Sequence, residues 1–393
     1  MINIKRRRFI QRMSSGLAML GLGFLPVSCG GSSKTTKNST RILVPEGTTP
    51  RIIAQSGFRV LPDNPDYWIS APDGAGTVAL DDGGWIYVCN SELNAKGGVS
   101  AIRFDNKGDI IDSYPILENS RRNCSGNMTP WGTWLSCEEV PDGVVWECDP
   151  LGVEPAKKRP ALGLFAHESV LVDPVTTEMY LTEDKPNGRF YRFTPDTLDA
   201  GSEQITEKGQ LAVARVINGL VDWLPIDDPS GASLPTRYQQ SESQAFEGGE
   251  GICYFDGMIY FTTKGDNRIW TFNTRSNLLE VFAEADGIVH SVDDIVSTNS
   301  GNLLVAEDGT NMRITLFPAN KQSPKTIMQL PDHKSSEVTG LAFNPSQTRL
   351  YFNSQRGVSG DSEDGISFEL LGDFNNLELD KPLVEWILDY ETI

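Results

Sequence analysis

The sequence is short of positive charge. Its 393 residues include 34 lysines and arginines against 53 aspartates and glutamates, which gives a formal net charge of −19 at pH 7. Binding nucleic acid through its phosphates requires a basic surface, so this class of function is excluded. A polyanionic substrate fits such a chain only where bound cations reverse the local charge. The excess of carboxylates predicts either oxygen-ligand cation sites or simply a soluble, self-repelling surface.

Helical periodicity and long hydrophobic runs are also scarce. The apolar segment at residues 16–27 is too short to span a bilayer as a stable helix. Beyond it, apolar residues recur in short runs between turn residues, which is typical of β-strands. No serine nucleophile motif is apparent, so a covalent intermediate on serine is not expected.

Residues 1–30 have the features of an export signal rather than of a folded domain. Residues 6–11, Arg-Arg-Arg-Phe-Ile-Gln, fit the twin-arginine pattern that addresses folded proteins to an export machinery. An imperfect lipoprotein cleavage box precedes Cys29, so a lipid anchor at this cysteine stays open. Residues 31–50 are predicted to be a polar tether. We therefore expect an exported protein that is periplasmic, outer-membrane-anchored or extracellular.

The sequence has six cysteines, and five remain when Cys29 is assigned to the signal. An odd number in an oxidising compartment leaves at least one thiol free, metal-bound or in an intermolecular bond. Cys137 is the candidate for the metal-bound thiol, because two glutamates follow it directly at the end of an apolar run. A merely buried thiol is the alternative. Cys89 and Cys253 lie within apolar runs and are expected to be small buried side chains.

A short strand pattern, apolar residues followed by a polar or acidic exit, recurs along the chain. Its successive marks are Tyr87, Trp134, Tyr180, Tyr260, Leu304 and Tyr351. Most marks are about 45 residues apart, the length of a four-stranded propeller blade, and one interval is longer by about 35 residues. We predict an all-β, six-bladed β-propeller over residues 51–393, with residues 199–243 as an inserted loop region. Residues 51–60 and 383–390 are the candidates for the strand that closes the ring; a large sandwich of hairpins is the alternative fold.

Polar residues fall at two positions of the repeat, just before its first strand and just after its second. The first series is Asn123, His167, Glu168, Glu247, Glu250, Asp293, Asp294 and Glu337; the second is Asn90, Glu92, Cys137, Glu138, Glu139, Glu183, Asp184, Glu307 and Asp308. In a hairpin, the start of one strand lies near the end of its antiparallel neighbour, so the two series are expected to meet on one face of the ring. Hard cations would neutralise their repulsion. His167, one of three histidines, is expected to be a hydrogen-bonded core residue.

These residues also resemble a known family. Residues 129–139, Thr-Pro-Trp-Gly-Thr-Trp-Leu-Ser-Cys-Glu-Glu, are similar to the signature of the PhoX-type alkaline phosphatases, bacterial secreted proteins. Between about residues 70 and 360, further stretches follow in the order of that family. They are His167-Glu168, Tyr180–Lys185, Phe190–Phe193, Glu250-Gly251, Tyr260–Lys264, Leu304–Gly309, Glu337–Gly340 and Arg349–Arg356.

The resemblance implies a six-bladed propeller that carries two ferric ions (Fe3+) and calcium ions (Ca2+) near its axis and hydrolyses phosphate monoesters without zinc. One iron of the family is held by a cysteine thiolate, and the matching position is Cys137. The carboxylates carried over as metal ligands are Glu92, Glu168, Glu250, Glu307 and Glu337. Arg356 is expected to clamp a phosphoryl oxygen through its planar fork, and Lys264 is a further catalytic candidate. The chain is shorter than the well-characterised type of the family, so insertions around the substrate mouth are expected to be missing.

The expected partners are a small-molecule phosphate ester, the twin-arginine export machinery and, at Cys29, a lipid; we expect a monomer that binds no nucleic acid. Two rival functions use the same fold. The first is a calcium-dependent propeller hydrolase of lactones or sugar esters, in which calcium alone is the Lewis acid. The second is a non-catalytic propeller that is stabilised by calcium and binds a protein or a glycan on one face.

Overall fold

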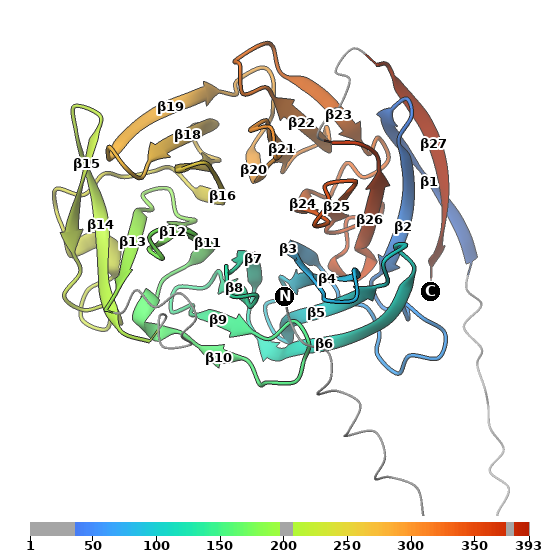
Figure 1. Cartoon of the computed structure of the whole chain (residues 1–393), viewed down its shortest axis with the longest axis horizontal. Helices are drawn as coiled ribbons and strands as arrows, with labels where there is room; N and C mark the ends of the chain where they lie inside the picture. The colour runs from blue at the N-terminus through green and yellow to red at the C-terminus, as the bar shows by residue number, and fades with distance from the viewer. Residues whose placement is uncertain (1–35, 197–206, 375–380, 393) are drawn as a thin grey trace, which may run out of the picture.

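The computed structural model describes residues 36–196, 207–374 and 381–392. They form antiparallel meanders around one central axis, with short 3-10 turns between some strands (Figure 1). The innermost strands are β3 (Pro72–Ala79), β7 (Asn123–Met128), β11 (His167–Val172), β16 (Gly249–Phe255), β20 (Val292–Ser297) and β24 (Val338–Phe343). Each contacts the next around the ring, and β24 contacts β3, so the circle is closed. The predicted all-β propeller fold is confirmed.

Outside each inner strand the meander continues outward. The second strands are β4 (Trp85–Ser91), β8 (Trp134–Glu138), β12 (Met179–Glu183), β17 (Met258–Thr263), β21 (Leu303–Glu307) and β25 (Arg349–Ser354). The third strands are β5 (Gly97–Phe104), β9 (Val145–Cys148), β13 (Phe190–Pro195), β18 (Arg268–Asn273), β22 (Arg313–Phe317) and β26 (Ile366–Leu371). The outer strands are β6 (Ile110–Ser120), β10 (Lys157–Lys158), β14 (Gly209–Ile217), β19 (Leu278–Glu284), β23 (Lys325–Gln329) and β2 (Thr49–Gln55). The 3-10 turns are η2 (Pro160–Leu162), η4 (Thr236–Tyr238) and η5 (Ser362–Asp364).

The second strands carry the residues that mark the repeat in the sequence, and they are almost wholly buried. Tyr87 and Tyr351 are 0% exposed, and their rings pack 4.9 Å apart across two meanders. Strands covered on both faces bury apolar side chains on both, which explains why the sequence shows short continuous runs there. The hydrophobic clusters combine residues of neighbouring meanders, so each meander completes its core only against the next one.

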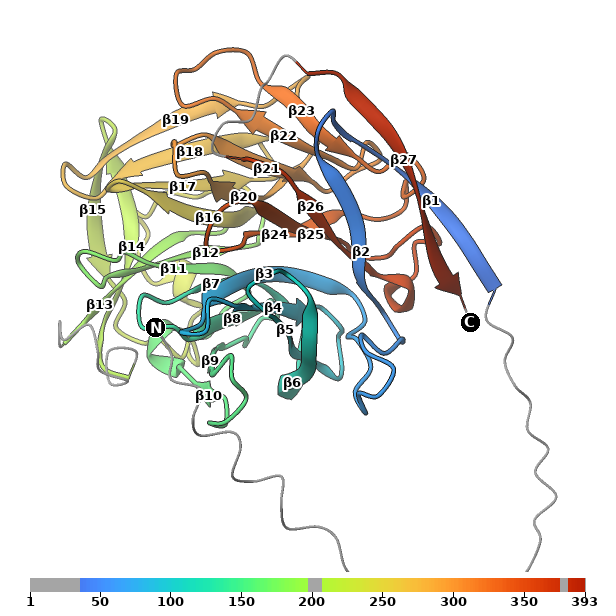
Figure 2. The same cartoon turned by 45° about the vertical axis from the view of Figure 1, so that its right-hand side comes forward.

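The ring is closed by a strand from the N-terminal side of the chain. β2 pairs with β26 along its length, from Thr49 opposite Leu371 to Gln55 opposite Ile366. Of the two candidate segments, residues 51–60 therefore supply the closing strand. The other candidate forms β27 (Leu383–Thr392), which pairs with β1 (Thr36–Pro45) on the outside of the ring (Figure 2).

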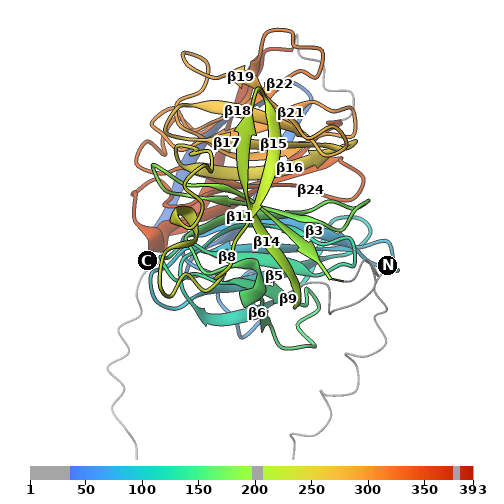
Figure 3. The same cartoon turned by 90° about the vertical axis from the view of Figure 1, so that its left-hand side faces the viewer.

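Two predicted boundaries need correction. Residues 36–45 were expected within a polar tether, but they form β1, because Ile42 and Val44 are fully buried and pack in the core behind β22 and β26. The predicted insertion, residues 199–243, contains β14, which is the outer strand of its meander, and β15 (Leu220–Pro225) (Figure 3). β15 pairs with both β14 and β19, so two meanders merge into one nine-stranded sheet. Hydrogen bonding thus separates five sheets, and the number of six blades stays a prediction.

The export signal and Cys29 lie outside the described residues. Where the chain is described, no helix is long and apolar enough to cross a membrane. The five cysteines in the described ranges are free, and Cys89 and Cys253 are buried as expected. His167 is a core residue as expected, with its Nε2 at 3.0 Å from the Gly163 carbonyl oxygen.

The closing strand is held by a buried carboxylate, which gives a first prediction. Glu369 is 1% exposed and binds Arg51 of β2 (Nε to Oε1, 2.8 Å) and Arg349 of β25 (Nη1 to Oε1, 2.5 Å). Glu369→Gln leaves two arginines facing a neutral amide, so we expect the free energy of unfolding to fall by about 2 kcal/mol. Asp82→Asn, which breaks an exposed pair with Arg103, is expected to cost less than about 1 kcal/mol. Equal losses in urea unfolding would contradict this role of Glu369.

A second prediction concerns His333, which joins β1 to the ring. Its Nε2 lies 2.7 Å from Thr40 Oγ1 and its Nδ1 lies 2.8 Å from Ser354 Oγ. Burial lowers the pKa of His333 to about 4, so protonation favours the unfolded chain, whose histidines titrate near 6.5. Stability from this group is present above pH 6.5 and is lost as the pH falls toward 4. The wild type should therefore lose about 1–2 kcal/mol more than His333→Gln between pH 7 and pH 5; identical losses would contradict it.

Candidate metal and active site

A cavity of about 210 Å³ lies on the axis, where the inner strands begin and the second strands end. Charged residues form nearly all of its wall, with one thiol and one hydroxyl. The lining residues are Asp73, Glu92, Arg122, Cys124, Glu139, Glu168, Asp184, Glu250, Lys264, Asp293, Asp308, Glu337, Thr339 and Arg356. Members of both predicted series therefore meet at this cavity: Glu168, Glu250, Asp293 and Glu337 of the first series, and Glu92, Glu139, Asp184 and Asp308 of the second.

One ring of lining residues comes from the inner strands. In every inner strand named above, the second residue lines the cavity. These residues are Asp73, Cys124, Glu168, Glu250, Asp293 and Thr339. Because the second residue of each of these strands faces the axis, side chains that are far apart in the sequence form one ring of potential metal-binding atoms.

A repeated β-bulge aims these side chains at the axis. In β3, the register passes from Pro72 opposite Ser91 to Ala75 opposite Cys89, so β3 has one residue more than β4 over this interval. The same shift occurs at the start of β7, β11, β16 and β20, and one step later in β24. A bulge interrupts strict alternation and re-aims a side chain, and bulges are common beside active sites.

A second ring comes from the residues that directly follow the second strands. They are Glu92, Glu139, Asp184, Lys264 and Asp308, which line the cavity, and Gln355, which contacts it. Gln355 donates from Nε2 to Asp73 Oδ2 at 2.5 Å and to Glu92 Oε2 at 2.7 Å. The last meander is thus joined to the first through side chains of the site.

At the ends of the second strands β8, β12 and β21, two acids stand together and only the second lines the cavity. The first is the last residue of its strand and points to an arginine instead: Glu138 to Arg121, Glu183 to Arg237 and Glu307 to Arg313. Adjacent side chains of an extended chain point to opposite sides, which separates the two roles.

The predicted ligand Glu307 lies outside the cavity wall, and Asp308 lines the cavity instead. Glu307 is fully buried and accepts hydrogen bonds from Arg313 Nη2 at 2.7 Å and from the His290 backbone N–H at 2.9 Å. Its carboxylate is satisfied by these contacts. The sequence places both acids at the end of the strand, but it does not show which of the two side chains points to the axis.

The predicted thiol ligand, Cys137, also lies outside the cavity wall. Cys137 is fully buried in an apolar cluster with Leu135, Val145 and Phe165, whereas Cys124 lines the cavity. Cys124 Sγ lies 3.1 Å from Glu168 Oε1 and 3.9 Å from Asp73 Oδ2. The signal that points to Cys124 is its position, second in an inner strand, which it shares with Glu168 and Glu250.

The other predicted site residues all line the cavity: Glu92, Glu168, Glu250, Glu337, Arg356 and Lys264. The residues missing from the predicted ligand and catalytic set are Asp73, Arg122, Cys124, Glu139, Asp184, Asp293, Asp308 and Thr339. Asp73 was hidden because β3 begins Pro-Asp-Gly-Ala-Gly, which lacks the apolar run that marks the inner strands β11 and β16.

The cavity holds more negative charge than its own cations can neutralise: nine carboxylates face three cationic side chains. Burial, added to by neighbouring carboxylates, raises the pKa of Asp73, Glu168 and Glu337 well above the usual carboxyl range. The same causes raise the pKa of Glu139 to about 8 and that of Asp293 to about 7, although Arg122 and Lys264 oppose them. Without further cations, the site therefore holds protons near neutral pH.

The basic residues are fixed by the same carboxylates. Arg122 Nη2 bonds both Glu92 and Glu139. Arg356 donates from Nη1 to Glu337 Oε1 at 2.9 Å and from Nε to the Ser335 carbonyl oxygen at 3.3 Å. Burial alone would lower the pKa of Lys264, but Glu250, Asp293 and Asp308 raise it well above its usual value. All three cations are therefore held in place and charged.

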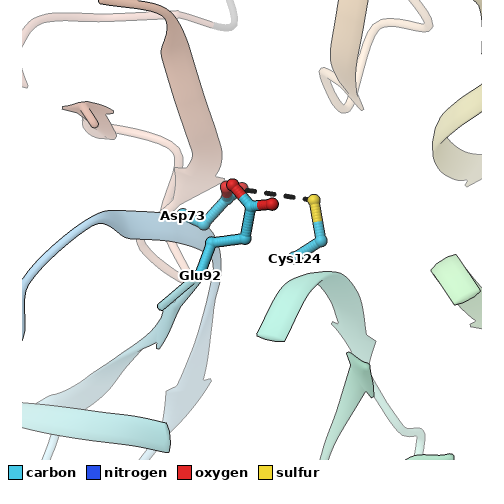
Figure 4. A group of neighbouring side chains, drawn as sticks. All are labelled: Asp73, Glu92 and Cys124. Atoms are coloured by element: carbon cyan, nitrogen blue, oxygen red, sulfur yellow. Dashed lines mark hydrogen bonds between the residues drawn. The ribbon is translucent and has the colours of Figure 1, made fainter. Parts of the chain in front are cut away.

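The donor atoms fit metal ions. Four overlapping groups have their atoms within 4.8 Å of one another: Asp73, Glu92 and Cys124; Cys124, Glu139 and Glu168; Glu168, Glu250 and Asp293; and Asp293, Asp308 and Glu337. In the first group, the carboxylates approach the sulfur from a different meander (Figure 4). Glu250 Oε1 is buried and makes no hydrogen bond, and its counter-charge is the Lys264 ammonium at 3.2 Å. A thiolate among carboxylates suits a transition metal, and carboxylates alone suit calcium.

Comparison with known proteins shows a similarity to one family. A model of the alkaline phosphatase PhoX family matches residues 142–277. Pseudomonas fluorescens PhoX in complex with vanadate, a transition state analogue, has a similar structure, with a TM-score of 0.71 at 15% identity over 86% of this chain and 97% of that chain. A Bacteroides thetaiotaomicron protein of unknown function has a TM-score of 0.50 at 9% identity, over 85% and 76% of the two chains. No curated protein matches the sequence.

At these identities the two structures show a shared fold. The family match adds a link in sequence. Its range spans β9 to β18 and contains Glu168, Asp184, Glu250 and Lys264 of the cavity. Together, these findings confirm that the chain resembles the PhoX-type alkaline phosphatases.

Proposed function

We propose that the chain is a metal-dependent hydrolase of phosphate monoesters, with the axial cavity as its active site. The observation that carries this proposal is the lining itself, a thiol and nine carboxylates that converge with three basic side chains on the axis. The match to the PhoX family supports the same chemistry. An acidic protein can bind an anionic ester only where cations reverse the local charge, and the clustered donor atoms would hold such cations.

The metals proposed are ferric iron and calcium. Cys124, with Asp73 and Glu92 on one side and Glu139 and Glu168 on the other, would hold the iron, because its thiolate is the soft donor of the cavity. Asp293, Asp308 and Glu337 offer oxygen atoms alone, which suit calcium. When bound, these cations supply Lewis acidity toward phosphoryl oxygens and lower the pKa of water.

The chain's own residues would bind and orient the ester. Arg356 is held by Glu337 and Ser335 at the cavity wall, so its guanidinium is positioned before substrate arrives. A planar guanidinium matches two phosphoryl oxygens, which makes Arg356 the proposed clamp. Lys264 contacts three carboxylates and is the better candidate for charge compensation than for substrate binding. Because the cavity wall is almost entirely charged, we expect it to bind the phosphoryl group of the ester and not an apolar leaving group.

We further propose that the protein is exported through the twin-arginine route and acts outside the cytoplasm as a monomer. The pattern at residues 6–11 supports export, and Cys29 supports a lipid anchor. Export of a folded chain lets the metal site form before translocation.

Removing the proposed clamp gives a third prediction. Arg356→Ala should lower kcat/KM for a phosphate monoester about 10- to 100-fold, the loss expected for one charge-assisted contact to the phosphoryl group. Arg356→Lys should recover part of it, and Arg215→Ala, which breaks exposed ion pairs on β14, should change nothing. The measurement is steady-state kinetics with a chromogenic phosphate ester. Turnover of lactones but not of phosphate esters by the wild type would favour the rival hydrolase.

Exchanging the two cysteines for serine gives a fourth prediction. Cys124→Ser should lose most of its iron, measured by elemental analysis, because a hydroxyl is a poor substitute for a thiolate. Cys137→Ser should keep its iron but lose about 1–3 kcal/mol of stability, because it places a hydroxyl in an apolar cluster. Full iron in Cys124→Ser together with loss of iron in Cys137→Ser would reverse the assignment.

A further inference from the structure

Lys264 breaks the acidic pattern of the second ring. At the same position, after their second strands, other meanders place Glu92, Glu139, Asp184 and Asp308. The meander of β16 to β19 places a lysine there instead. The Lys264 side chain lines the cavity and is 30% exposed; Gln355 is the other residue of this ring without a carboxylate.

The ammonium group of Lys264 lies among three carboxylates. Its Nζ is 3.2 Å from Glu250 Oε1, 3.3 Å from Asp308 Oδ2 and 3.8 Å from Asp293 Oδ2. Glu250 and Asp293 come from neighbouring inner strands, and Asp308 follows the second strand of the next meander. The lysine therefore reaches across the boundary between two meanders, where a single cation contacts all three acids.

The same three acids belong to groups with metal-ligand spacing. Glu250 and Asp293 form one such group with Glu168, and Asp293 and Asp308 form another with Glu337. Asp293 is common to both groups and also contacts Lys264. Glu250 Oε1 is buried and faces the Lys264 ammonium at 3.2 Å, so the lysine supplies its counter-charge.

We propose that Lys264 Nζ takes the place of a divalent cation between Glu250, Asp293 and Asp308, so that metal ions in the wild type are held by the other groups of donor atoms in the cavity. This inference rests on the metal-binding part of the proposed function and is independent of the phosphatase activity. The separations of 3.2–3.8 Å suit an ammonium group. Calcium lies about 2.3–2.6 Å from its ligand oxygens, so a metal ion at this position needs the lysine to be absent and the acids to close in.

The consequence of removing the lysine charge follows from the burial of its partners. Glu250 is 2% exposed and Asp293 is 7% exposed. Buried carboxylates that lose their counter-charge are strongly destabilising unless a proton or another cation replaces it. A divalent cation with oxygen-only ligands is the direct replacement, so the variant should gain a calcium site that the wild type lacks.

The test compares metal content and stability in four proteins. Lys264→Met removes the charge at nearly constant volume, and Lys264→Arg keeps it. Lys185→Met is the matched control, because Lys185 is similarly exposed but has a single carboxylate contact, at 4.0 Å from Glu139 Oε1. Each protein is dialysed against calcium and analysed for calcium and iron per chain, and its thermal midpoint is recorded with chelator and with millimolar calcium.

We expect Lys264→Met to bind about one calcium ion per chain more than the wild type. The rise in its thermal midpoint between chelator and millimolar calcium should also exceed that of the wild type. Lys264→Arg and Lys185→Met should match the wild type in both readouts. If Lys264→Met folds only in calcium, that rescue supports the proposal. Wild-type calcium content in a folded Lys264→Met, or a variant that calcium does not rescue, overturns it. A wild type without any metal would instead overturn the proposed metal-dependent function.

Discussion

Electrostatic repulsion around the axis is the constraint on which the site depends. A closed ring of meanders brings the beginnings of all its inner strands to one mouth, so acidic residues at that position are forced together. The raised pKa values of Asp73, Glu168 and Glu337 express this repulsion. Three basic side chains offset part of it, and the remainder requires protons or metal ions. Part of the excess of acidic residues in the sequence is therefore concentrated in the axial cavity.

The fold assigns different roles to neighbouring acids. Glu138, Glu183 and Glu307 each form an ion pair with an arginine, while the next residue along the chain lines the cavity. The arginine partners neutralise the first acid, so only the second contributes uncompensated charge to the axis. The same sequence pair therefore supplies a structural ion pair and a candidate ligand, and the strand geometry decides which is which.

Much of the fold could be predicted from the sequence, because the repeat is built on buried second strands whose apolar runs are easy to recognise. Tyr87, Tyr180 and Tyr351 mark those strands correctly, since a strand covered on both faces leaves little choice of residue. β1 was missed because it is short of partners in its own vicinity and pairs only with residues more than 280 positions away, such as Leu43 with Gln329.

The sequence predicts at which ends of the strands the site lies, but it does not predict which side chains there face the axis. The sequence identifies Glu92, Glu168 and Glu250, which lie at the expected ends of strands. It does not reveal the bulges, and a bulge changes which of two adjacent residues faces the axis. The bulge at the start of β7 lies beside Cys124, and the alternation at the end of β21 turns Glu307 to Arg313 and leaves Asp308 at the cavity. Neither feature can be read from the sequence, and neither changes the chemical character of the proposed site.

The contact of Gln355 with Asp73 and Glu92 has a consequence for the order of folding. These residues stand at opposite ends of the propeller sequence, and the strand that closes the ring, β2, pairs with β26 across a similar separation. Such non-local contacts form late, because the intervening chain must first lose its freedom. A nascent or truncated chain thus has most of the acids but not their final arrangement, and tight metal uptake would report that the ring has closed.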